Sequence, residues 1–80
     1  MGIEQLNTLA RAFVGRHEQW NLVSVYGEHR TADLAEALAQ RNELNDDILR
    51  RFAALQFPQV KEVVRSHPNS SDETKALAAL

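Results

Sequence analysis

No cysteine occurs in this chain of 80 residues, and that absence limits how any fold it adopts can be held together. Disulfides, iron–sulfur clusters and thiolate zinc sites are all excluded. A chain this short buries a modest fraction of its surface, so a single core of this size is usually only marginally stable. We therefore expect an efficient helical core, a partner, or both.

The composition favours a helical globular domain. Apolar residues make up 44% of the chain and charged residues 25%, the formal net charge is −2, and only three glycines and two prolines occur. No apolar run approaches the ~20 residues that a membrane-spanning helix needs. The N-terminus lacks the pattern of a signal peptide, and Leu6 stands where a myristoylation signal needs Ser or Thr. We predict one domain over residues 1–80, located in the cytoplasm and without a membrane partner.

Apolar residues recur at helical spacing along most of the chain. The first apolar stripe spans residues 3–14 and includes Leu9 and Phe13, and Gly15 is predicted to end that helix. Residues 34, 35, 38 and 39 share one face of a second helix. The predicted helix starts further along the chain are Thr31, Asn45, Pro58 and the capping-box pair Ser70 and Glu73.

Residues 22–26 are the ambiguous segment. Their sequence, Leu-Val-Ser-Val-Tyr, is β-branched and aromatic and has the propensity of a strand. A single strand would have nothing to pair with in this chain. The context therefore favours a helix, with a strand as the alternative.

An internal repeat is visible when residues 35–55 are laid over residues 60–80, an offset of 25 positions. Residues 53–55 then fall on residues 78–80 with identical side chains, and two of the predicted helix starts coincide. Similar hairpins in an ordinary helical bundle are the alternative explanation. The predicted units, each a helix, a short loop and a second helix, are residues 3–29, 31–55 and 58–80.

The last unit carries a family resemblance. Residues 60–80, and above all His67-Pro68-Asn69-Ser70, resemble the leucine-rich repeat variant, a family of helical repeats. The match is weaker at residues 35–55, where Glu43 replaces the family's proline, and faint at residues 10–29. HEAT-like repeats are a neighbouring possibility, although their units are usually longer.

The resemblance implies a fold and no catalytic site. The predicted fold class is all-α, a short right-handed helical-repeat solenoid of about three helical hairpins. Some family members hold an iron–sulfur cluster before the repeats, which this chain lacks the cysteines to bind. About three units are needed before stacked repeats become stable, so this chain has about the minimum.

No residue pattern indicates catalysis. The three histidines are too widely separated to share a metal, and the paired carboxylates stand where helices are predicted to start. The glycines are scattered and form no phosphate-binding loop. We predict that the protein is not an enzyme and has no catalytic residue, no metal site and no cofactor.

The predicted function is a small non-catalytic protein–protein interaction module built from helical repeats. Terminal repeats normally carry a polar outer face, but this chain ends in an apolar segment. Leu77 and Leu80 are therefore predicted to contact a protein partner or a second copy; the alternative is that they fold back onto the core. Trp20, in the first predicted loop, is a candidate aromatic anchor.

Nucleic-acid binding is the less favoured alternative. On a solenoid, Arg16, Arg41 and Arg65 would line up as a ridge that could bind the phosphate backbone of a nucleic acid. The net negative charge of the chain argues against this function. A small phage or mobile-element protein that blocks a host complex also fits the length and acidity.

Overall fold

Six helices make up the part of the chain that the computed structural model describes, residues 2–80, and no strand occurs within it. The all-α class predicted from the sequence is confirmed, and residues 22–26 form a helix. The helices are α1 (Ile3–Trp20), α2 (Leu22–Tyr26), α3 (Glu28–Ala39), α4 (Asp46–Ala53), α5 (Pro58–Ser66) and α6 (Asp72–Ala78).

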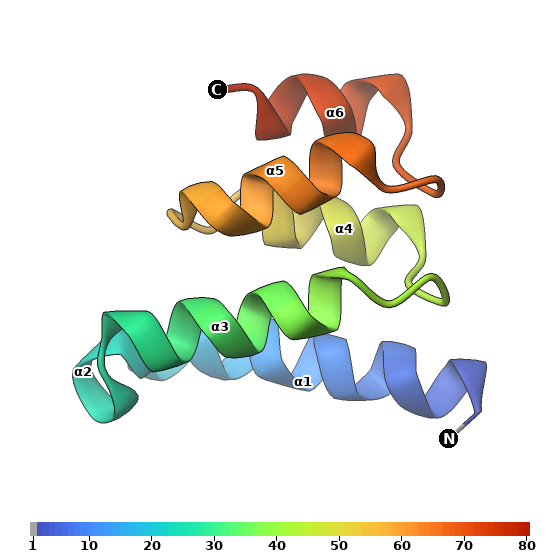
Figure 1. Cartoon of the computed structure of the whole chain (residues 1–80). Coiled ribbons are helices and arrows are strands. Elements are labelled where there is room, and N and C mark those ends of the chain that lie inside the picture. The colour runs from blue at the N-terminus through green and yellow to red at the C-terminus, as the bar shows by residue number, and fades with distance from the viewer. Residues whose placement is uncertain (1) are drawn as a thin grey trace.

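The helices are arranged in two layers (Figure 1). α3 and α5 lie side by side in one layer, while α4 packs against α1 and α6 in the other. α5 also contacts α4 and α6, and α2 connects α1 to α3 across one end of the molecule. The result is a compact, flattened globule with a radius of gyration of 11.5 Å and extents of 32 × 31 × 18 Å.

α1 does not end at Gly15, which corrects the prediction from the sequence. The helix continues to Trp20, and Asn21 then adopts a left-handed conformation with φ 50° while its N–H donates to the His17 carbonyl. A glycine inside a helix costs about 1 kcal/mol relative to alanine. Beyond the glycine, the ring of His17 lies 5.5 Å from that of Phe57 and Glu18 pairs with Arg51 of α4 at 2.9 Å, and these contacts offset the cost. Asparagine is among the few residues that tolerate the left-handed turn that ends the helix.

Thr31 is not an N-cap, a second correction. α3 begins three residues earlier, after Gly27, whose φ of +89° is one that L-amino acids rarely adopt. Thr31 is fully buried in the first turn of α3. Its hydroxyl donates to the Gly27 carbonyl at 2.8 Å and lies 3.2 Å from the Leu22 carbonyl, so it ties α2 to α3.

The other predicted helix starts are correct or nearly so. Asn45 is the N-cap residue of α4, and Pro58 is the first residue of α5. α6 starts one residue later than predicted, because Ser71 rather than Ser70 is the N-cap. The Ser71 hydroxyl accepts a hydrogen bond from the Thr74 N–H at 3.2 Å.

The core is centred on α4 and the residues around it. Phe52 is fully buried and stacks on Phe13 of α1, with 6.1 Å between the ring centroids. Because α4 lies between α1 and α6, half of its eight residues are buried. The other large, fully buried apolar side chains are Val14, Leu44, Ile48, Leu49, Val60 and Val64.

Candidate functional site

An open apolar groove, with a volume of about 490 Å³, lies between α1, α2 and α3. We call it the α1–α3 groove. Arg16 is the one charged residue among those that line it. The apolar lining residues are Leu9, Ala12 and Phe13 of α1, Leu22 and Tyr26 of α2, and Leu34 and Leu38 of α3.

The groove exists because α1 and α3 each carry two apolar faces. On α3, Ala32, Ala35 and Ala39 are buried in the core. Leu34 and Leu38 lie on a neighbouring face of the same helix and line the groove, and Leu34 is 46% exposed. A surface helix usually buries its single apolar stripe and turns polar residues outward. Here the small side chains face the core, while Leu34 is exposed and Leu38 is partly buried against the core at the edge of the groove.

Trp20 lies at the end of α1, one helical turn beyond Arg16 and on the same side of the helix. Its side chain is 64% exposed, so it does not fill a gap between helices. Phe57, in contrast, is buried, and its ring lies 5.5 Å from that of His17. Trp20 therefore extends the exposed apolar surface past one end of the groove, and its role as a binding anchor remains a prediction.

A second exposed apolar surface lies on α6. Glu73, Ala76, Leu77 and Leu80 follow one another at positions i, i+3, i+4 and i+7 and, with Arg50, line a shallow hollow. We call these four residues the α6 stripe. Leu77 is 40% exposed and Leu80 is 89% exposed. The two leucines therefore do not fold back onto the core, which was the alternative to an exposed edge.

The three arginines proposed as a ridge have different surroundings. Arg16 lines the apolar groove. Arg41 pairs with Glu43 at 3.2 Å, and Arg65 donates to the Ala78 carbonyl at 2.8 Å. Two of the three guanidinium groups are thus occupied by partners within the chain.

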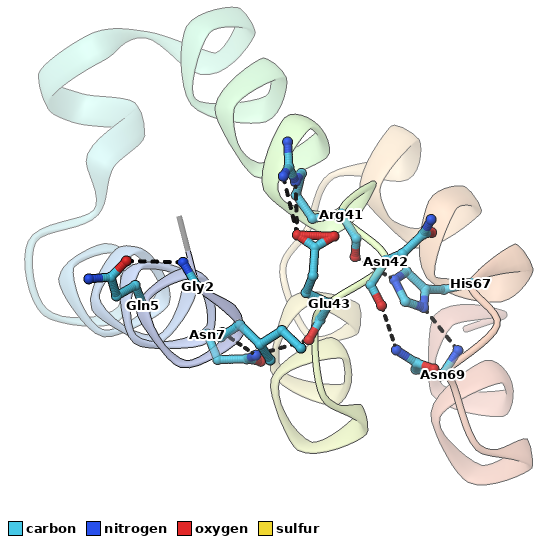
Figure 2. Close-up of polar contacts among 9 residues, drawn as sticks. Gly2, Gln5, Asn7, Arg41, Asn42, Glu43, His67 and Asn69 are labelled. Carbon is cyan, nitrogen blue, oxygen red and sulfur yellow. Dashed lines mark hydrogen bonds and ion pairs between the residues drawn. The ribbon is translucent and has the colours of Figure 1, made fainter.

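Polar side chains hold the loop between α3 and α4 from both sides (Figure 2). From α1, the Asn7 side-chain amide donates to the Glu43 carbonyl at 2.9 Å, and its oxygen accepts from the Asn45 N–H at 2.9 Å. From the loop between α5 and α6, the Asn69 amide donates to the carbonyls of Asn42 and Leu44 at 2.8 and 2.9 Å. Sequence reasoning singled out Asn69 only as part of the His67-Pro68-Asn69-Ser70 resemblance and gave it no role, and it missed Asn7, which belongs to no recognisable motif.

His67 completes this network. Its Nδ1 accepts a hydrogen bond from the Asn69 N–H at 3.0 Å, so the ring proton is on Nε2, which donates to the Arg41 carbonyl at 2.8 Å. Both ring nitrogens are therefore used to position two loops. The histidine has no free nitrogen for a metal, and residues 2–80 hold no group of three potential metal ligands.

Asp46 joins the start of α4 to the start of α6. Its carboxylate accepts from the Ser71 N–H at 2.8 Å and from the Thr74 hydroxyl at 2.7 Å. These two hydrogen bonds, with the Ser71 hydroxyl and the nearby Arg50, stabilise the ionised form and lower the pKa of Asp46. The carboxylate therefore links the first turns of the two helices.

We expect Asp46→Ala to lower the free energy of unfolding by about 1–2 kcal/mol at neutral pH, because hydrogen bonds to a charged group at a partly exposed site contribute about that much. Because the folded-state pKa lies below the usual 3.8, the ionised side chain stabilises the fold fully above that value. The contribution is lost as the pH falls through the lowered pKa. Urea denaturation of both proteins between about pH 7 and 2 should show the difference shrinking below about pH 4.

Asp47→Ala is the matched control for Asp46. Asp47 is exposed, and its ion pair is with Arg11 at 3.1 Å on the surface. Its removal should change the free energy of unfolding by less than about 0.5 kcal/mol. Equal effects of the two substitutions, or a difference that persists at low pH, would contradict the role assigned to Asp46.

No family model, curated protein or solved structure matches the chain. The structure itself shows a small all-helical globule of six helices. Within residues 2–80, none of the helices combines the length and the apolar character required to cross a membrane.

Proposed function

We propose that this chain is a small non-catalytic protein–protein interaction module that binds an amphipathic helix of a protein partner in the α1–α3 groove. The observation that carries the proposal is the groove itself, an open apolar surface with a single charged residue, Arg16. Contiguous exposed apolar patches on small proteins usually mark interaction sites. Two helices that flank an apolar groove are the usual receptor for the apolar face of a third helix.

The distribution of side chains in the groove supports a helical ligand. Leu9 and Leu34, on the two flanking helices, provide aliphatic walls. Tyr26 lines the groove, and Trp20 lies beyond it on α1; aromatic residues of this kind dominate the energetics of protein interfaces. A ligand helix with leucines at i, i+3, i+4 and i+7 would bury its apolar stripe there.

We further propose that the six helices form a short right-handed helical-repeat solenoid, as the resemblance to the leucine-rich repeat variant and HEAT-like repeats implies. The loops at residues 41–44 and 67–70 support it, because Leu44 N–H bonds to the Arg41 carbonyl and Ser70 N–H bonds to the His67 carbonyl. At these loops the offset between units is 26 residues rather than 25. In a solenoid, the α1–α3 groove lies between the first unit and the second, since Leu34 and Leu38 belong to the second.

The test is titration with a synthetic amphipathic helical peptide that lacks tryptophan and carries leucines at i, i+3, i+4 and i+7. Trp20 is the single tryptophan of the chain, so its fluorescence reports on the end of the groove. We expect saturable binding with a blue shift of the emission. Leu34→Glu should weaken binding by at least about tenfold, since a charge would replace an apolar wall of the groove.

Ile3→Glu is the matched control for the groove variant. Ile3 is an exposed apolar residue of α1 that does not line the groove, so binding should be unchanged. Equal weakening by both substitutions, or no binding by the wild-type chain, would contradict the proposal. Binding of duplex DNA that weakens steeply with salt and requires Arg16 would favour the nucleic-acid function instead.

A further inference from the structure

We infer that the occupant of the α1–α3 groove is the α6 stripe of a second copy of this chain, so that copies associate head to tail. The inference rests on the function proposed above, because it names the helix that the groove binds. Three features of the structure carry it: the pattern of the stripe, the charges on the two surfaces, and their positions in the fold.

The α6 stripe has the residue spacing of an amphipathic helix that binds in an apolar groove. Ala76, Leu77 and Leu80 lie at i+3, i+4 and i+7 from Glu73, which is the spacing by which amphipathic helices insert their anchors. Leu80 continues the helical path beyond α6, because its N–H bonds to the Leu77 carbonyl at 3.2 Å. The exposed leucines of the stripe match a groove whose walls are the exposed leucines of α1 and α3.

The charges on the two surfaces are complementary. Arg16 is the one charged residue lining the groove, and within residues 2–80 no carboxylate lies within ion-pair distance of it. Glu73, at the start of the stripe, is 82% exposed and contacts Arg50 at 3.3 Å. Arg50 also contacts Asp46 at 3.6 Å, so it keeps a carboxylate partner when Glu73 turns to Arg16 of the next copy.

The two surfaces lie at opposite ends of the molecule. α1, α2 and α3 form one end and α6 forms the other, with α4 and α5 between them (Figure 1). A single chain therefore cannot place its own stripe in its own groove. A contact between two different surfaces of identical copies is heterologous, and it leaves one groove and one stripe open to further copies.

The experiment blocks each surface separately in the full chain and then mixes the two variants. Leu34→Glu blocks the groove and Leu77→Glu blocks the stripe, and both positions are exposed enough for the substitutions to leave the fold intact. Circular dichroism checks that each variant is folded. Should Leu77→Glu unfold, Leu80→Glu replaces it, since Leu80 is almost fully exposed.

Sedimentation velocity at concentrations up to about 1 mM, the range of weak helix contacts, measures the assembly. We expect the wild-type mass to rise with concentration beyond that of a dimer. Each variant alone should keep the mass of one chain, and the equimolar mixture should form dimers and nothing larger. The Ile3→Glu control should assemble as the wild type does.

Charge reversal tests the pairing of Arg16 with Glu73. Arg16→Glu and Glu73→Arg should each weaken assembly by about tenfold or more, because each places like charges opposite one another. A chain that carries both substitutions should regain most of the wild-type assembly. Loss of assembly in the double variant would overturn the assigned pairing of the surfaces.

Two other outcomes would overturn the inference and separate it from the proposed function. A wild-type chain that stays monomeric up to about 1 mM while its groove still binds the synthetic peptide rejects self-association and leaves the interaction module standing. A monomer that binds no peptide rejects both. Wild-type dimers that never extend, together with one variant that dimerises by itself while the other stays monomeric, indicate a symmetric contact at one surface and also reject the head-to-tail arrangement.

Discussion

Phe52→Ala is expected to lower the free energy of unfolding by about 3–5 kcal/mol, the usual cost of removing a fully enclosed aromatic ring. The ring, near the C-terminal end of α4, is completely buried and stacks on Phe13, so the loss combines the transfer free energy, a cavity and an aromatic contact. A domain of this size has a total stability on the order of 5–10 kcal/mol. Each kcal/mol shifts the melting temperature by roughly 4–8 °C, so thermal denaturation followed by circular dichroism gives a large signal.

Phe52→Leu and Val25→Ala are the controls for this substitution. Leucine fills most of the space left by the ring, and its cost should stay below about 2 kcal/mol. Val25 is exposed on α2, and its truncation should change the stability by less than about 0.5 kcal/mol. A loss of less than about 1 kcal/mol for Phe52→Ala would show that the ring is not enclosed as described.

Asn7→Ala should cost about 2–3 kcal/mol, an unusually large effect for a polar residue. Its buried side chain donates to the Ile3 and Glu43 carbonyls and accepts from the Asn45 N–H, each at 2.9 Å. Truncation removes the hydrogen-bonding partner of two backbone groups in the loop between α3 and α4. Urea denaturation monitored by circular dichroism measures the loss.

Asn42→Ala is the matched control for Asn7. Asn42 lies in the same loop, but it is exposed, and it is its backbone carbonyl that accepts the hydrogen bond from Asn69. The truncation should therefore change the stability by less than about 0.5 kcal/mol. Similar losses for the two asparagines would mean that the loop is simply sensitive to alanine and that the side chain of Asn7 does not hold it.

Helix existence was predictable, and helix boundaries were predictable where a local signal sets them. Caps and apolar spacing depend on neighbouring residues, so Asn45 and Pro58 marked the correct positions. Gly15 failed as a stop because packing on a neighbouring helix outweighs a local propensity of about 1 kcal/mol. Thr31 failed as a cap because its hydroxyl satisfies carbonyls of α2 and of the preceding turn, a tertiary contact that a single sequence does not reveal.

The candidate site was predictable in part. The exposure of Leu77 and Leu80 was one of two alternatives that the sequence left open, the other being that both leucines fold back onto the core. The groove was missed, because the spacing placed Leu34 and Leu38 on the same face as the buried alanines. A signal was present: adjacent apolar pairs repeated every four residues make a face wider than one neighbouring helix covers. Recognising that the leucines of the pair face outward required the packing of the other helices.

The reach of Asn7 along the chain has a consequence for how the molecule forms. Its side chain forms hydrogen bonds with Glu43 and Asn45, which lie 36 and 38 positions further along the chain. In contrast, α4, α5 and α6 are joined by short loops and contact one another. Loop-closure entropy and topology favour assembly of the local helices first and docking of α1 afterwards. Since α1 forms one wall of the groove, the groove is complete only after α1 has docked. A ligand held there stabilises α1 against detachment by mass action, so occupancy and the lifetime of the native state are linked.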